Sequence, residues 1–152
     1  MDTENREQPR TTAIGLVADA KEMLRAAEIL HESGELRVLT PTYYLLGHAT
    51  EVALKAFLLA HREDLENLKN RYGHDIAKSA KSVVDAKHSA ISPLVEEHLP
   101  EIVRLNFHYR AKEFEYRVTG AKSFPSIERL IGFLQAVIPL IEPVAYKAYP
   151  AR

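Results

Sequence analysis

Apolar residues recur at intervals of three and four along most of this chain, the spacing that places side chains on one face of an α-helix. The first such run lies between Thr11 and Gly34, and the second extends from about Thr42 to beyond His61. Only residues 113–118 alternate polar and apolar side chains, which indicates an extended connector. Because a β-sheet needs a second alternating run to pair with, the sequence predicts an all-α protein.

Glycine, proline and capping residues divide the helical pattern into four or five helices, expected to form an up-and-down bundle. Gly34 is suited to end the first helix, and Pro41 fits the first turn of the second. After Gly73, Asp75 is a good N-cap for the third helix. The expected helices span, in order, residues 11–34, 42–61, 76–88, 92–109 and 126–146. Proline predicts a kink at Pro100 and a bend near Pro139 and Pro143.

Length and composition favour one globular domain inside the cell. A chain of 152 residues can bury a core without staples, and we expect a disordered tail at residues 1–10 and a single domain over residues 11–149. The chain contains no cysteine, which excludes disulfides and thiolate metal sites. No uninterrupted apolar run approaches the length of about 20 residues that spans a bilayer, so we expect a cytoplasmic protein without a membrane partner. With a net charge of −1, any nucleic-acid contact must be local.

Three polar residues form a stripe on the second helix, which is otherwise apolar on most sides. His48, Glu51 and Lys55 follow one another at helical spacing, so they project from one side. If this stripe is buried, it could act as an acid/base cluster. If it faces water, Glu51 and Lys55 form an ordinary ion pair one turn apart. The sequence alone does not choose between these two interpretations.

A second candidate site contains cations, a histidine and aromatic residues near the end of the fourth helix. Arg104 and His108 are one turn apart, so a guanidinium could bind a phosphate while an imidazole transfers a proton. This is the minimum for metal-independent RNA cleavage through the 2′-hydroxyl, with Arg110 and Arg117 positioning the strand. The alternative is a solvated helix face on which Glu101 pairs with Arg104.

Metal chemistry has one weaker signal. Dinuclear sites in helical bundles use Glu-x-x-His pairs, and the chain contains a clear copy at Glu28 and His31. However, His31 falls in the last turn of the first helix, where a histidine is favourable without any metal. No phosphate-binding glycine loop occurs. We therefore expect no cofactor and no metal, and a bundle metalloprotein is the weakest alternative.

Two segments together resemble the HEPN family, the helical "higher eukaryotes and prokaryotes nucleotide-binding" domains. They are the helix 44–56, with sequence YLLGHATEVALKA, and the motif Gly73-His74-Asp75-Ile76 about twenty residues later. The resemblance covers most of residues 40–120 and implies a bundle of four or five helices, commonly a homodimer. Many members are RNases of toxin–antitoxin and defence systems, marked by an Arg and a His with four to six residues between them. Arg104 and His108 have three.

The leading hypothesis is a HEPN-like binding or accessory module in an RNA-linked stress, toxin–antitoxin or defence process. Its expected partners are a second copy of the chain, RNA or a nucleotide, and an antitoxin-type protein. The alternative is a metal-independent RNase that uses Arg104 and His108. The last helix adds an argument for a homodimer, because it carries more apolar residues than one bundle face needs. A central, buried helix is the simpler explanation.

Overall fold

The computed structural model describes residues 11–61, 65–110 and 124–148. The expected N-terminal tail, the expected connector at residues 113–118 and Arg117 therefore lie outside the described residues.

The described residues form seven α-helices and no β-strand, which confirms the prediction of an all-α protein. Two short segments complete the helical path: a 3₁₀ turn, η1, before α2 and a π-helical turn, η2, before α4. The elements in chain order are α1 Ala13–Glu32, η1 Leu36–Val38, α2 Leu39–Ala60, α3 Leu65–Asn67, η2 Leu68–Tyr72, α4 Ile76–Asp85, α5 Ile91–Glu97, α6 Leu99–Arg110 and α7 Ile127–Ala148.

Local sequence accounts for most of these boundaries. Thr12 caps α1, its Oγ1 accepting a hydrogen bond from the Gly15 backbone N–H at 3.0 Å. Asp75 caps α4 as predicted, with its carboxylate accepting from the Lys78 N–H at 3.0 Å. The predicted fourth helix is instead two helices, α5 and α6, separated by a turn at His98. Pro100, which has no backbone N–H, lies in the first turn of α6, where the N–H groups have no partner within the helix. By contrast, α7 continues through both of its prolines.

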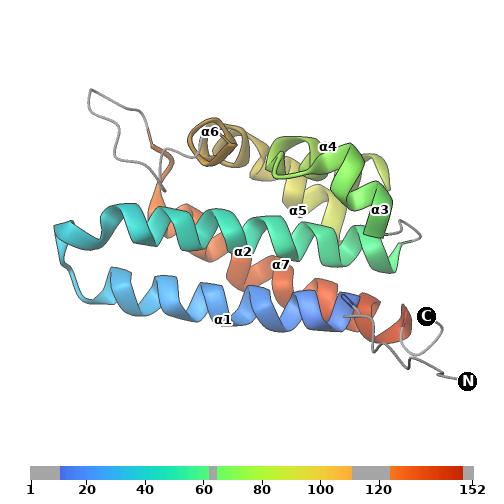
Figure 1. Ribbon diagram of the computed structural model, residues 1–152, viewed down its shortest axis with the longest axis horizontal. Coiled ribbons are helices and arrows are strands. Elements are labelled where there is room, and N and C mark those ends of the chain that lie inside the picture. Colours follow the sequence, from blue (N-terminus) through green and yellow to red (C-terminus); the bar gives the residue numbers. More distant parts are fainter. Residues whose placement is uncertain (1–10, 62–64, 111–123, 149–152) are drawn as a thin grey trace, which may run out of the picture.

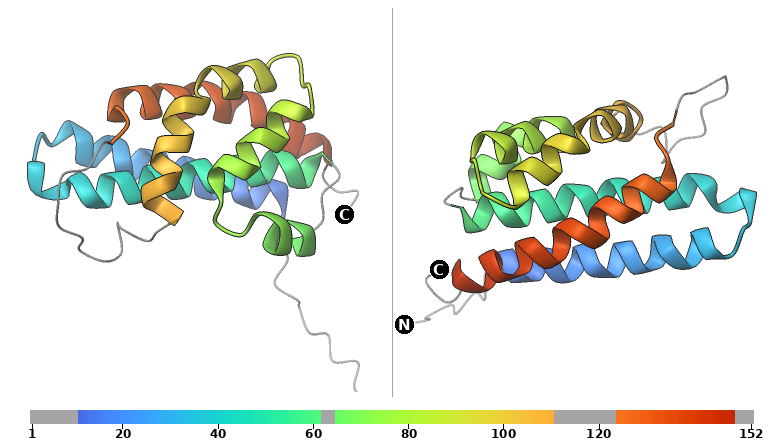
Figure 2. Two further views of the ribbon diagram at one scale, coloured as in Figure 1. Left: turned by 90° about the horizontal axis from the view of Figure 1, so that it is seen from above. Right: turned by 180° about the vertical axis from the view of Figure 1, so that it is seen from behind.

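The helices are arranged in layers around α2. Helices α1 and α2 run antiparallel over their whole length, α4, α5 and α6 lie on the other side of α2, and α7 crosses behind the α1–α2 pair (Figures 1 and 2). Helix α2 contacts α1, α4, α6 and α7, so it is the centre of the structure. Small side chains let α1 and α2 approach closely, since Ala20, Ala27, Ala49 and Ala56 are fully buried. The second helix, which is apolar on most sides by its sequence, is mostly buried.

The apolar surface of α7 is used within the chain. Of its nine large apolar residues between Ile127 and Ile141, all but Leu140 are buried. This agrees with the simpler explanation, a buried core helix, and the composition of α7 no longer argues for a dimer. By length and composition α7 could also cross a membrane, and it is the one such helix among the described residues. Core helices of soluble proteins share both properties.

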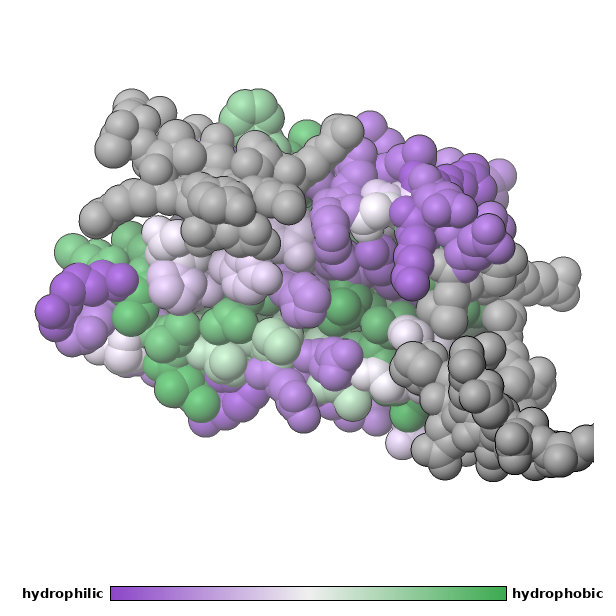
Figure 3. All heavy atoms as spheres, viewed as in Figure 1, coloured by the Kyte–Doolittle hydropathy of each residue, from purple (hydrophilic) through white to green (hydrophobic). Residues whose placement is uncertain are grey.

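Hydrophilic side chains form a large group on the surface in Figure 3. They cover the region of α3 and α4, and a smaller group lies at the opposite end, where α1 meets α2, with hydrophobic side chains frequent along α1 and α2 between them. The polar network described next lies where α2 meets the turn that leads into α4.

Candidate functional site: a polar network around Glu51

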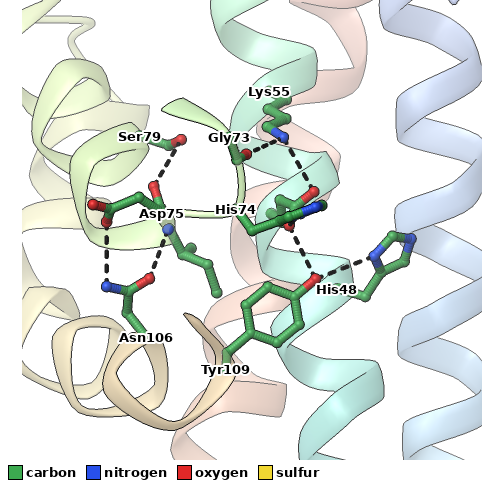
Figure 4. A network of polar contacts seen from close by, with 10 residues as sticks. His48, Lys55, Gly73, His74, Asp75, Ser79, Asn106 and Tyr109 are labelled. Carbon is green, nitrogen blue, oxygen red and sulfur yellow. Dashed lines mark hydrogen bonds and ion pairs between the residues drawn. The ribbon is translucent and has the colours of Figure 1, made fainter. Parts of the chain in front are cut away.

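Glu51 is a carboxylate in the middle of the central helix, and it is only 4% exposed. Its Oε1 accepts hydrogen bonds from the Tyr109 hydroxyl and from Nδ1 of His74, both at 2.9 Å. Its Oε2 lies 3.1 Å from Nζ of Lys55, one turn further along α2 (Figure 4). Glu51, in the middle of the polar stripe, is therefore buried, while His48 and Lys55 are partly buried. The expected Glu51–Lys55 ion pair exists, but it does not lie on a face that water covers.

The turn before α4 brings His74 to this carboxylate. Gly73 ends the π-helical turn η2 with a φ of 51°, a left-handed conformation that favours glycine. Its carbonyl accepts a hydrogen bond from Lys55 Nζ at 2.5 Å, which attaches the turn to α2. The next residue, His74, is 71% exposed at its side chain, although its Nδ1 reaches the buried carboxylate. Lys55 from α2 and His74 from the turn thus both contact Glu51, and Lys55 also binds the turn.

Tyr109 joins α6 to the network. Its hydroxyl donates to Glu51 and lies 3.4 Å from Nδ1 of His48. Its ring packs against the backbone of α2 at Gly47, where a Cβ atom would come within 2.5 Å of the ring carbon Cδ2. Glycine at this position therefore lets α6 approach α2 closely enough for the hydroxyl to reach Glu51. His48 is the outermost member, half-buried and with its ring stacked on Tyr44.

A neighbouring set of contacts fixes the start of α4. Asn106, which is 8% exposed, accepts a hydrogen bond from the Ile76 backbone N–H at 2.8 Å. Its amide group donates to Asp75 at 3.2 Å. Asp75 thus caps α4 and contacts α6 at the same time, and Figure 4 shows its contact with Asn106. Together, Asn106 and Tyr109 place the Gly73–Asp75 turn between α2 and α6.

The network keeps Glu51 ionised. Burial raises the pKa of a carboxyl group, but here the hydrogen bonds from His74, Lys55 and Tyr109 and the charge of Lys55 outweigh it. The pKa of Glu51 therefore lies below its ordinary value. An ionised carboxylate only accepts hydrogen bonds, so His74 must donate through Nδ1–H. In the neutral ring Nε2 then carries the lone pair. The arrangement is an exposed imidazole whose tautomer and orientation are set by a buried carboxylate.

The structure separates the environments of Arg104 and His108. Arg104 is exposed, whereas His108 is 4% exposed, so the expectation that both lie on a solvated face is wrong for His108. The His108 ring is covered by Phe124, with ring centroids 4.4 Å apart, and contacts Phe107 edge-on. The expected pairing of Glu101 with Arg104 is also replaced, because Glu101 binds Arg129 of α7.

The remaining predicted site residues lie elsewhere. Arg110 ends α6, but its side chain lies outside the described residues, as does all of Arg117. Glu28 accepts a hydrogen bond from Gln135 at 2.8 Å, while His31 lies 3.5 Å from Glu128, so the two have separate partners. Among residues 11–61, 65–110 and 124–148, no group of three or more His, Cys, Asp or Glu side chains could hold a metal ion.

Sequence reasoning identified three members of the network and missed the others. His48, Glu51 and Lys55 share one helix, so their spacing revealed them. His74 comes from the turn before α4, and Asn106 and Tyr109 come from α6, so spacing along α2 could not reveal them. The available signal was the Gly-His-Asp motif itself, in which a polar turn follows directly on a helical segment and precedes an N-cap. No protein-family model, no curated protein and no solved structure matches this chain at a significant level.

Proposed function

We propose that this protein is a HEPN-like up-and-down helical bundle that binds RNA, as a binding or accessory module of an RNA-linked stress, toxin–antitoxin or defence process. One observation supports this most directly. The two segments that carry the resemblance lie side by side, with Glu51 bonded to His74 and Lys55 bonded to the Gly73 carbonyl. Segments joined by such contacts act as one structural unit, as expected if the resemblance reflects a common architecture.

The environment of His108 favours binding over cleavage. A general base must reach the proton that it removes, and the His108 imidazole is buried under Phe124 while Arg104 points into solvent. A strand held by Arg104 would therefore not meet the His108 ring in this arrangement. An RNase that uses Arg104 and His108 would require a rearrangement of α6, or of Phe124 over the His108 ring, to expose the imidazole.

Two parallel assays on the same RNA test the proposal. Binding is followed by fluorescence anisotropy of a labelled single-stranded RNA, and cleavage by gel analysis of that RNA with EDTA present. We expect binding without cleavage. Arg104→Ala tests the alternative RNase, because Arg104 is exposed and its loss leaves the core intact. His108→Ala is added after circular dichroism has shown that this variant folds.

Each outcome identifies one function. Cleavage that survives EDTA and disappears in both variants would replace the binding module with a metal-independent RNase. Absence of both binding and cleavage would remove the RNA link altogether. Light scattering at micromolar concentration tests the proposed homodimer in the same samples, and a monomer mass would contradict it. A pull-down from cell lysate tests the antitoxin-type partner, and cell fractionation tests the cytoplasmic location.

A further inference from the structure

The stretch Leu68–Asp85 concentrates positive charge beside His74. It contains four cations, Lys69, Arg71, Lys78 and Lys81, and two acids, Asp75 and Asp85, in a chain whose net charge is −1. All four cations are exposed. The region of α3 and α4, to which this stretch belongs, is covered by hydrophilic side chains in Figure 3. The Asp75 carboxylate is already used by the Lys78 backbone N–H and by Asn106. We call residues 68–85 the basic segment. Its charge is complementary to a phosphate backbone.

His74 lies at the centre of the basic segment with one ring nitrogen available. Nδ1 donates to Glu51, so Nε2 of the neutral ring is an acceptor, and the side chain is 71% exposed. A lone pair accepts a hydrogen bond from a hydroxyl group, whereas a phosphate oxygen has no proton to donate. On an RNA strand the ribose 2′-hydroxyl is such a donor, and DNA lacks it.

The surrounding contacts hold His74 in place. Lys55 fixes the Gly73 carbonyl before it, at 2.5 Å, and Asn106 fixes the Ile76 N–H after it, at 2.8 Å. Glu51 itself is held by Tyr109, so the imidazole has a rigid carboxylate behind it. A group fixed in this way forms a hydrogen bond at a smaller loss of conformational entropy than a free side chain does.

We propose that the basic segment binds the backbone of single-stranded RNA and that Nε2 of His74 accepts a hydrogen bond from a ribose 2′-hydroxyl. This inference rests on the proposed RNA-binding function and adds to it a surface and a means of distinguishing RNA from DNA. Lysine and arginine supply the attraction to phosphate, which is common to both nucleic acids. His74 supplies the preference for RNA.

The first test compares RNA and DNA oligonucleotides of one sequence by fluorescence anisotropy at pH 8, which favours neutral imidazole. We expect RNA to bind about threefold to tenfold more tightly than DNA, the effect of one neutral hydrogen bond. His74→Ala should abolish this preference by weakening RNA binding and leaving DNA binding unchanged. His31→Ala is the matched control, because His31 also lies beside a glutamate, Glu128, but on α1. It should keep the preference.

The second test addresses the basic segment through salt dependence. Lys78→Gln with Lys81→Gln should weaken RNA and DNA binding alike and reduce the slope of log affinity against log salt by about 1.4, since each contact to single-stranded phosphate contributes about 0.7. Lys21→Gln with Arg25→Gln makes the same charge change on α1, in the layer on the other side of α2 (Figure 1). This control should leave the slope unchanged.

The outcomes separate this inference from the function on which it rests. If the wild type binds RNA and DNA equally, or His74→Ala weakens both equally, the 2′-hydroxyl contact is wrong while RNA binding stands. If the two lysine substitutions change neither affinity nor slope, the binding surface lies elsewhere. If the wild type binds no RNA, the proposed function fails and this inference fails with it.

Discussion

Replacing Glu51 by glutamine removes the charge on which the polar network is built and leaves its shape unchanged. Three donors converge on the carboxylate, from Lys55, His74 and Tyr109. A glutamine oxygen can still accept from one side, but its amide group is itself a donor. The amide group would therefore face at least one of the three donors, and this donor would lose its acceptor.

The burial of the partners determines the magnitude. The side chains of Glu51 and Lys55 are 6% and 14% exposed, and removing one partner of a buried ion pair costs about 3–5 kcal/mol. The contact with His74 adds little, because that side chain is largely exposed and such pairs are worth about 0–1 kcal/mol. Lys55 keeps the Gly73 carbonyl as an acceptor, which reduces the loss. We expect Glu51→Gln to lower the free energy of unfolding by about 3 kcal/mol.

Urea unfolding at neutral pH, followed by circular dichroism, measures this loss. The midpoint should fall while the slope with denaturant stays the same, and the melting temperature should drop by about 6–12 °C for a chain of this size. Glu128→Gln is the control, since the Glu128 side chain is 74% exposed and its removal should change stability little. A loss below about 1 kcal/mol for Glu51→Gln would show that the buried pair contributes far less than its geometry implies.

Three further predictions concern the same region. Because the pKa of Glu51 is lowered in the folded protein, its contribution to stability is present above the unfolded pKa of about 4.3 and is lost as the pH falls through the folded pKa. The difference in free energy of unfolding between wild type and Glu51→Gln should therefore narrow in acid, as measured by urea unfolding followed by circular dichroism at a series of pH values. Gly47→Ala should lower stability by about 1 kcal/mol net in urea unfolding, since crowding the Tyr109 ring outweighs the gain in helix propensity, whereas Gly132→Ala in open space should be neutral or stabilising. Asn106→Ala should cost about 1–3 kcal/mol by leaving the first backbone N–H of α4 unsatisfied, and that amide should then exchange faster with deuterium in NMR spectra.

Local patterns were sufficient for the helices. The three- and four-residue spacing predicted α1, α2, α4 and α7 within a few residues, and Asp75 was correctly identified as an N-cap. These features depend on residues that are neighbours in sequence, so the sequence carries the information directly. The break at His98 was expected only as a kink, because proline disturbs a helix locally while the packing around it decides whether the two halves separate.

The candidate site could be predicted only in part. Helical spacing placed His48, Glu51 and Lys55 on one face. The side chains that cover this face are Tyr109 and His74, which lie 58 and 23 residues from Glu51 in the sequence. His108 shows the opposite error. Its position on α6 indicated solvent, but the side chain is buried and its ring contacts Phe124, 16 positions further along the chain.

The sequence by itself determined the all-α class, the main helices and the existence of a polar stripe on the central helix, because periodicity and capping act over a few residues. Only the tertiary structure decided that Glu51 in this stripe is buried, that its carboxylate is shared with His74 and Tyr109, and that His108 is buried while His74 is exposed. The physical reason is that burial and hydrogen-bond partners are properties of contacts between helices. A helix specifies which residues share a face, and its neighbours determine what that face meets.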